Sequence, residues 1–121
     1  MGRASQEKGA SLEREIEVAL GALPGVIVWR NVVAKVMLRS GAQILSGIGG
    51  KGAPDFVVEV QGPRGWRILW VESKCGEFAK LSKEQREWHA AAALLGRHVV
   101  LARSVEQVRI AVEHMRAGFE P

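Results

Sequence analysis

Residues 55–74 read DFVVEVQGPRGWRILWVESK, two apolar runs on either side of a Gly-Pro-Arg-Gly turn. Pro63 occupies the favoured second position of that turn, so the two runs are predicted to form an antiparallel hairpin. A two-residue turn at Pro63 and Arg64 then places Asp55 opposite Glu72. Directly opposed residues project to the same face, with Cβ atoms about 4.5–5.5 Å apart. The two carboxylates are therefore expected to be neighbours.

Strand alternation adds Lys74 to the face that carries Glu72 and sends Ser73 to the other face. Two opposed carboxylates repel each other unless a cation or a shared proton lies between them. A hard divalent cation resolves this conflict, which predicts a metal site at Asp55 and Glu72. The alternative is structural, with Asp55 as a turn residue and Glu72 and Lys74 as a solvated charge pair. We favour the metal site because a glycine-rich loop adjoins it and would let a phosphate backbone approach closely.

That loop also fits the pattern G-x-G-x-x-G through Gly47, Gly49 and Gly52. A nucleotide-binding loop requires a helix after the third glycine. Here residues 53–54 lead into a β run instead, and Lys51 is followed by Gly rather than the Ser or Thr of a P-loop. We therefore set a nucleotide-binding role aside.

The N-terminal half is predicted to contain one helix and several strands. Residues 1–10 are polar and basic, which suggests a flexible basic arm. Apolar residues at helical spacing follow from Ser11, a candidate N-cap, and Pro24 ends that helix. Residues 26–33 are rich in β-branched side chains, and a weaker extended run follows around 36–45.

The C-terminal part is predicted to form a helix, a strand and a final helix. Residues 82–85 and 104–107 each fit a capping box at a helix start, and the last helix runs to about Met115. Gly96 ends the first of these helices, and residues 98–102 form a short buried strand. The class is α/β, a mixed β-sheet flanked by helices in a single domain of residues 11–117.

The composition fits one globular domain, with 121 residues of which 47% are hydrophobic and 25% charged. Seventeen Lys and Arg against thirteen Asp and Glu give a net charge of +4, which favours a polyanionic partner. The single cysteine argues against a disulfide framework or a cysteine zinc cluster. We expect an intracellular, cytoplasmic protein, including a nucleoid-associated protein or a viral protein inside a host cell, without membrane association. The four tryptophans are expected mostly in the core.

Gly-x-Pro-Asp at 52–55, sixteen intervening residues and Glu-Ser-Lys at 72–74 resemble the signature of PD-(D/E)XK nucleases. Within that superfamily the chain is similar to the VRR-NUC family, since a helix beginning Leu-Ser-x-x-Gln at 81–85 and a strand ending Val-Val-Leu-Ala-Arg-Ser at 99–104 follow in order. The resemblance extends from about Leu12 to Val112. It implies a restriction-endonuclease-like core with the order α-β-β-β-α-β-α.

The resemblance also implies residue roles. Asp55, Glu72 and the backbone carbonyl of Ser73 would hold Mg²⁺ or Mn²⁺, and Lys74 would orient or activate the attacking water and offset charge on the scissile phosphate. Gln85 would help to order that water. The implied reaction is hydrolysis of a DNA phosphodiester that leaves a 5′-phosphate.

Two of the implied positions have structural alternatives that remain open. Gln85 is also the third residue of a capping box and could cap its helix. Glu13 matches the metal-site glutamate of the family's first helix, but acidic residues also favour a first helical turn because of the helix dipole.

The expected partner is DNA, bound through salt-sensitive backbone contacts. The candidate contact residues are Lys35, Arg39, Lys51, Lys80, Lys83, Arg86 and Arg97. One small domain with one acidic cluster cuts one strand per site, so symmetric cutting of a four-way (Holliday) junction needs a homodimer. Such a dimer, with a role in DNA repair and recombination, is the function implied by the resemblance. The alternatives are a flap, single-strand or duplex nuclease, a binding module on the same fold that does not cut, and an interaction protein with an incidental acidic hairpin.

Overall fold

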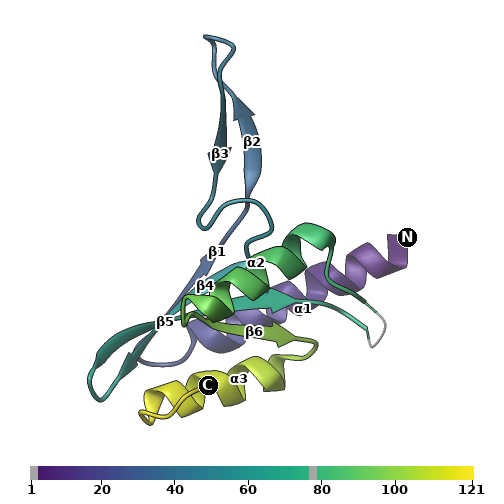
Figure 1. Cartoon of the computed structure of the whole chain (residues 1–121). Helices are drawn as coiled ribbons and strands as arrows, with labels where there is room; N and C mark the ends of the chain where they lie inside the picture. Colours follow the sequence, from purple (N-terminus) through teal and green to yellow (C-terminus); the bar gives the residue numbers. More distant parts are fainter. Residues whose placement is uncertain (1–2, 77–78) are drawn as a thin grey trace.

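The computed structural model describes residues 3–76 and 79–121, with side chains from Gly9 onward. These residues form three helices and six strands (Figure 1). In chain order the elements are α1 (Arg3–Gly21), β1 (Val26–Arg30), β2 (Ala34–Met37), β3 (Gln43–Ser46), β4 (Phe56–Gly62), β5 (Gly65–Ser73), α2 (Lys83–Leu94), β6 (His98–Ala102) and α3 (Val105–Arg116).

Four of the strands form one mixed sheet in the order β1-β4-β5-β6. β1, β4 and β5 are antiparallel neighbours, and β6 lies parallel to β5 after the crossover through α2. Strands β2 and β3 pair only with each other among the described residues and form a separate two-stranded sheet. Without that hairpin the order is α-β-β-β-α-β-α, so the predicted α/β class and core order are confirmed.

The β4–β5 hairpin has the predicted register. Phe56 pairs with Val71 and Gly62 pairs with Gly65, so Pro63 and Arg64 form the two-residue turn. One step beyond the ladder, this register brings Asp55 to Glu72. The turn chemistry thereby fixes which side chains meet at the far end of the hairpin.

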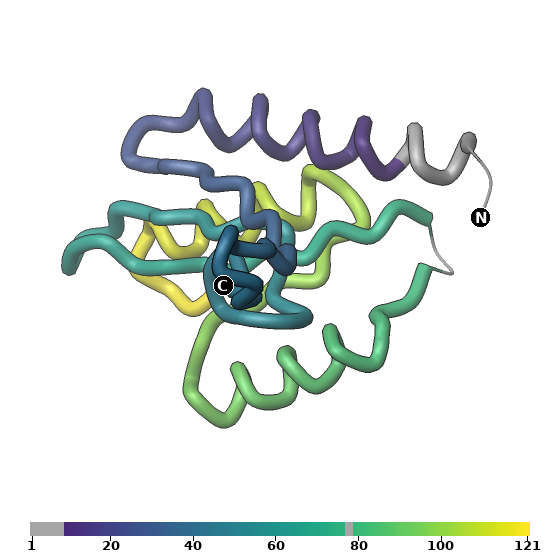
Figure 2. The backbone as a smooth tube through the Cα atoms, turned by 90° about the horizontal axis from the view of Figure 1, so that it is seen from above, coloured from purple at the N-terminus to yellow at the C-terminus, as the bar shows by residue number. Residues whose placement is uncertain are grey.

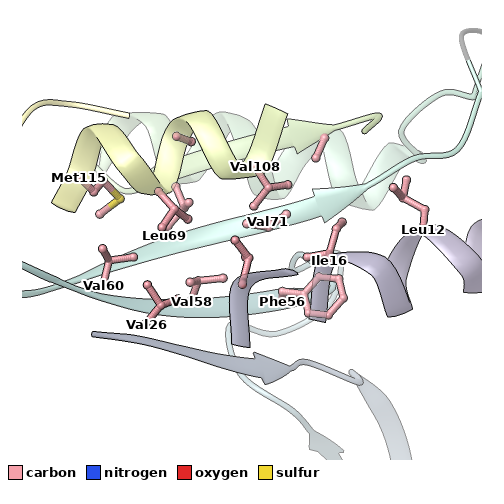
Figure 3. Close-up of a cluster of buried hydrophobic side chains, with 14 residues drawn as sticks. Leu12, Ile16, Val26, Phe56, Val58, Val60, Leu69, Val71, Val108 and Met115 are labelled. Atoms are coloured by element: carbon pink, nitrogen blue, oxygen red, sulfur yellow. The ribbon is translucent and has the colours of Figure 1, made fainter. Parts of the chain in front are cut away.

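Helices cover the two faces of the sheet unequally. In Figure 2, α1 and α2 lie on opposite sides of the strands. Helices α1 and α3 pack against one face, where Ile16 and Val108 meet Phe56, Val58 and other buried side chains (Figure 3). On the opposite face, α2 contributes a smaller cluster in which Trp88 packs on Val57 and Trp70. The larger core packs against the β4–β5 hairpin. The side chain of Glu72 lies on the other face of the sheet, toward α2.

Several sequence expectations need correction. Helix α1 begins at Arg3, so Ser11 is an interior residue and not an N-cap. The Ala, Gln, Glu and Lys of residues 3–10 have high helix propensity and extend the helix. Residues 1–2 of the expected basic arm lie outside the described residues. Strand β1 ends at Arg30 and not at residue 33, because Asn31 turns its side chain to the neighbouring loop.

The weaker extended run around residues 36–45 consists of two strands, not one. β2 and β3 form a hairpin that projects from the body (Figure 1). We call residues 34–46 the projecting hairpin. The tryptophans also divide evenly, since Trp70 and Trp88 are buried but Trp29 and Trp66 are exposed. Among the described residues, no helix is both long and apolar enough to cross a membrane.

Candidate active site

The predicted carboxylate pair is joined through backbone hydrogen bonds. The Asp55 amide donates to Oε2 of Glu72 (3.1 Å). In return, Oδ2 of Asp55 accepts from both the amide (2.9 Å) and the hydroxyl (2.8 Å) of Ser73. Strand alternation had predicted that the Ser73 side chain faces away, but Asp55 precedes β4 and Ser73 ends β5, where the pleat no longer fixes direction. These contacts hold the carboxyl group of Asp55 against the end of β5.

Glu72 is the most deeply buried acidic group among the described residues, with 1% of its surface exposed. Burial, followed by the nearby Asp55 charge, raises the pKa of Glu72 from 4.5 to about 8, although Lys74 acts to lower it. Nζ of Lys74 lies 3.9 Å from Oε1 of Glu72, and 23% of the Lys74 side chain is exposed. Lys74 thus lies near the Glu72 carboxylate, and Asp55 contacts Glu72 through its backbone amide, so the common face of the three side chains stays a prediction.

Gln85 caps α2, which was one of its two expected roles, and also contacts Glu72; its role in ordering the attacking water stays a prediction. Its Oε1 accepts from the Ser82 amide (2.8 Å), and its own amide donates to the Ser82 hydroxyl (3.2 Å), which completes the capping box of α2. Its Nε2 donates to Oε1 of Glu72. The Gln85 side chain thus caps the start of α2, and its hydrogen bond to Glu72 offsets part of the free-energy cost of burying that group.

A cleft of about 450 Å³ opens beside these residues. Its walls include Asp55, Gln85, Glu13 and the glycine-rich loop, whereas Glu72 and Lys74 are not among the lining residues. Gly52 brings that loop onto the start of α2, because a Cβ at this position would lie 2.3 Å from the Glu84 carbonyl oxygen. A ligand in the cleft would reach Asp55 first.

Glu13 lies in the same cleft but already has a cationic partner. Oε2 of Glu13 accepts from Nη1 of Arg30 (2.7 Å), and Arg30 also donates to Glu17. Among residues 3–76 and 79–121, the structure contains no group of three or more Asp, Glu, His or Cys side chains that could hold a metal ion. The expected metal role of Glu13 therefore stays a prediction, and its observed contact is an ion pair between α1 and β1.

Arg30 and Asn31 are site residues that sequence reasoning missed. Both line the cleft, and Arg30 also lies 5.6 Å from the ring centre of Phe56. Asn31 is 8% exposed, donates from Nδ2 to the carbonyls of Ile48 (2.8 Å) and Pro54 (2.9 Å), and accepts at Oδ1 from the Ile48 amide (2.7 Å). The sequence signal for these two residues was that the polar pair Arg30-Asn31 interrupts the β-branched run of residues 26–33.

The predicted DNA-contact residues are exposed, but they are spread over several elements. Lys35 and Arg39 lie on the projecting hairpin, Lys80 precedes α2, and Lys83 and Arg86 lie on α2. Lys51 lines the cleft, with its Nζ 3.4 Å from Glu84. Arg97 instead stacks over the rings of Trp70 and Trp88, 5.5 Å from each centre, which is a structural contact.

The donor set fits a hard divalent cation. Asp55 and Glu72 supply two carboxylates from adjoining residues at the ends of two neighbouring strands, and Mg²⁺ in proteins commonly uses one or two carboxylates with waters and substrate phosphates. The pKa of Glu72 is raised first by its burial and then by the nearby Asp55 charge, and a bound cation would favour the ionised carboxylate against both effects. A three-carboxylate site that includes Glu13 would first require Arg30 to release that carboxylate.

The fold and these contacts can be compared with known proteins. A structure search finds a solved structure described as "VRR_NUC domain", with a TM-score of 0.62 and 29% identity over 88% of this chain and 96% of that one. This likeness supports the assignment of the chain to the VRR-NUC family. Scans of protein-family models and of curated proteins found no match. The same likeness indicates a nuclease-type domain, and the mixed sheet flanked by helices is consistent with a restriction-endonuclease-like fold.

Proposed function

We propose that this VRR-NUC domain is a Mg²⁺- or Mn²⁺-dependent endonuclease that hydrolyses DNA phosphodiesters. The observation that carries the proposal is the meeting of Asp55, Glu72 and Lys74 where β4 begins and β5 ends, beside an open cleft. An incidental acidic hairpin would have no reason to bury Glu72 almost completely while placing a lysine and a glutamine amide against it.

Asp55, Glu72 and the Ser73 carbonyl would hold the cation, which supplies Lewis-acid polarisation of the scissile phosphate. Lys74 would offset the negative charge that develops on the phosphoryl oxygens as water attacks phosphorus and the bond to the 3′-oxygen breaks. Its partial exposure beside Glu72 suits this role, because part of the Lys74 side chain remains open to solvent. Gln85 keeps Glu72 oriented and, through its cap, places α2 against the site.

The proposed enzyme acts as a homodimer, and two features of the surface support this. The chain exposes 7940 Å², whereas a monomer of 13.2 kDa is expected to expose about 6400 Å². The excess of about 1500 Å² is in the range that one subunit of an obligate dimer buries. Extended features such as the projecting hairpin contribute to that excess.

The second feature is an uncovered apolar area on the α2 face of the sheet. Ile27 and Ile68 lie on either side of Glu59 in the ladder, and Trp29 and Trp66 extend the same area. These four side chains are between 41% and 54% exposed. We call them the apolar sheet face. A second copy of the chain would bury them in a two-fold contact, in which each subunit offers the same surface.

The proposed substrate is branched DNA, in particular a four-way junction, because two linked sites can cut two strands symmetrically. Flap, single-stranded and linear duplex DNA are the other nuclease substrates to compare. Lys74→Ala removes the charge at the scissile phosphate and is expected to lower cleavage about 100-fold or more. Arg109→Ala removes an exposed cation of α3, which pairs with Glu106 on the opposite side of the sheet from α2, and serves as the control.

The test is cleavage of these four labelled DNAs by wild type, Lys74→Ala and Arg109→Ala with Mg²⁺, Mn²⁺ or EDTA. Metal-dependent cutting that disappears in Lys74→Ala alone supports the nuclease and ranks its substrates. Binding without cutting under every metal condition would replace the nuclease with a binding module on the same fold. Absence of both DNA and cation binding would favour an interaction protein.

A further inference from the structure

The projecting hairpin has no packing partner within the described part of the chain. Neither β2 nor β3 contacts another helix or strand there, and the hairpin stands away from the body (Figure 1). Val36, Met37, Leu38, Ile44 and Leu45 are between 39% and 63% exposed. An isolated two-stranded hairpin is marginally stable in water, so these apolar groups call for a partner.

The charge of this segment selects the kind of partner. Residues 31–54 contain no Asp or Glu, but they carry Lys35, Arg39 and Lys51. Asp55 and the acidic site begin directly afterwards. An acid-free, cationic segment is suited to a polyanion, whereas the apolar side chains beside its tip are suited to the faces of bases rather than to phosphates.

The base of the hairpin is fixed rigidly to the candidate active site. Asn31 binds Ile48 and Pro54 on the returning chain, and its own amide donates to the Asp55 carbonyl (2.7 Å). The two chains cross closely, since a Cβ on Gly47 would lie 2.7 Å from the Val32 carbonyl oxygen. Val32 and Asp55 line the same cleft. DNA held at the cleft is therefore within reach of the hairpin.

The length of the hairpin also fits DNA. Five residue steps lead from Ala34 at its base to Arg39 near the tip, which corresponds to about 17 Å of extended chain. A two-stranded ribbon can enter the major groove of DNA. Apolar side chains that enter between bases unstack them, and this is easiest where stacking is already broken.

We propose that the projecting hairpin is a wedge for branched DNA, with Met37 and Leu38 packing on bases exposed at the branch point while Lys35 and Arg39 bind the flanking phosphates. This inference rests on the proposed function, because it assumes that the cleft receives DNA. It assigns the preference for branches to the hairpin and the cutting to Asp55, Glu72 and Lys74.

The wedge is tested by binding in EDTA, where no strand is cut. Fluorescence anisotropy compares a four-way junction with a linear duplex of the same sequence, using wild type, the Met37→Ser/Leu38→Ser variant and the Val18→Ser/Ile110→Ser variant. The last pair removes two exposed apolar groups from α1 and α3 and is the matched control. The Met37→Ser/Leu38→Ser variant should bind the junction about tenfold more weakly than wild type does, and its affinity for duplex should change at most about twofold.

Two further measurements separate the roles within the hairpin. Lys35→Gln/Arg39→Gln should weaken both DNAs and reduce the salt dependence of binding by about two ion equivalents. A 2-aminopurine base at the branch point should change its fluorescence when wild type binds and should not when Met37→Ser/Leu38→Ser binds. Melting curves of all variants check that these exposed substitutions leave the fold intact.

Several outcomes would overturn the wedge. One is that Met37→Ser/Leu38→Ser loses affinity equally for junction and duplex, and another is that it loses affinity for neither. A third is that this variant becomes monomeric while it binds DNA normally, which would make the hairpin a contact between copies of the chain. The proposed function fails separately. If wild type prefers junctions through Met37 and Leu38 but cuts no DNA with any metal, the wedge stands and the nuclease does not.

Discussion

The side-chain amide of Gln85 donates a hydrogen bond to the buried carboxylate of Glu72 while its carbonyl oxygen caps α2. This contact couples the start of a helix to the most buried acid of the site. It explains why a glutamine suits this position, since one amide group provides both the acceptor for the cap and the donor for the carboxylate.

Substitution of Gln85 can separate these two roles. Gln85→Glu keeps an acceptor for the Ser82 amide but replaces the donor with a charge beside Glu72. In EDTA at neutral pH we expect Gln85→Glu to melt below wild type, and Mg²⁺ to recover more stability in the variant than in wild type. Gln85→Ala should lose about 1–2 kcal/mol in both conditions, because it removes the cap contact and the hydrogen-bond donor to Glu72 without adding a charge. Equal behaviour of the two variants would reduce Gln85 to a cap.

The pH dependence of stability should reveal the ionisation of Glu72. Its pKa in the folded protein is about 8 against an ordinary 4.5, so between these values the folded state holds a proton that the unfolded state has released. The resulting stabilisation is complete below about pH 4.5 and is lost as pH rises through 8, at up to about 1.4 kcal/mol per pH unit. Urea unfolding in EDTA at several pH values measures this slope.

The isosteric variant Glu72→Gln is the control, because it cannot ionise and should show a flatter profile over the same range. With Mg²⁺ present, wild type should regain stability at the alkaline end, since the cation binds the ionised form. If wild type and Glu72→Gln have the same pH profile in EDTA, then Glu72 titrates normally and the electrostatic argument for a cation at this site is lost.

The sequence predicts the centre of the site better than its surroundings. The Asp55–Glu72–Lys74 group follows from the length of one turn and the period of a strand, which are local rules. Arg30 could not be placed in the same way, because its contacts with Glu13 and Glu17 depend on how α1 crosses β1. For a related reason, the sequence did not predict that the projecting hairpin forms a separate sheet. Its β-branched residues indicate strands, but local pattern does not tell which sheet a strand joins.

The glycine-rich loop offers a test of close packing at the site. Gly52 has φ +85° and a Cβ there would meet the Glu84 carbonyl, whereas Gly50 has φ +81° with open space around it. Gly50→Ala should cost about 1 kcal/mol from the left-handed backbone alone. Gly52→Ala should cost about 2 kcal/mol or more, since the start of α2 must also move. Chemical denaturation measures both values, and similar costs would show that the loop and α2 separate easily.

The apolar sheet face is expected to determine the oligomeric state. Ile27→Ser/Ile68→Ser removes two exposed apolar groups that flank Glu59, and a two-fold contact loses each of them twice. We expect sedimentation velocity to show a dimer for wild type and a dissociation constant at least about tenfold higher for this variant. Val18→Ser/Ile110→Ser, which removes similar groups from α1 and α3, should remain dimeric.

The same variant links assembly to activity. A monomer keeps Asp55, Glu72 and Lys74 intact, so it should still nick a strand with Mg²⁺ but should no longer cut both strands of a four-way junction in one binding event. A supercoiled plasmid with an extruded cruciform distinguishes the results, because two coordinated cuts linearise it and one cut only relaxes it. Linear product from a variant shown to be monomeric would mean that paired cutting does not require the apolar sheet face.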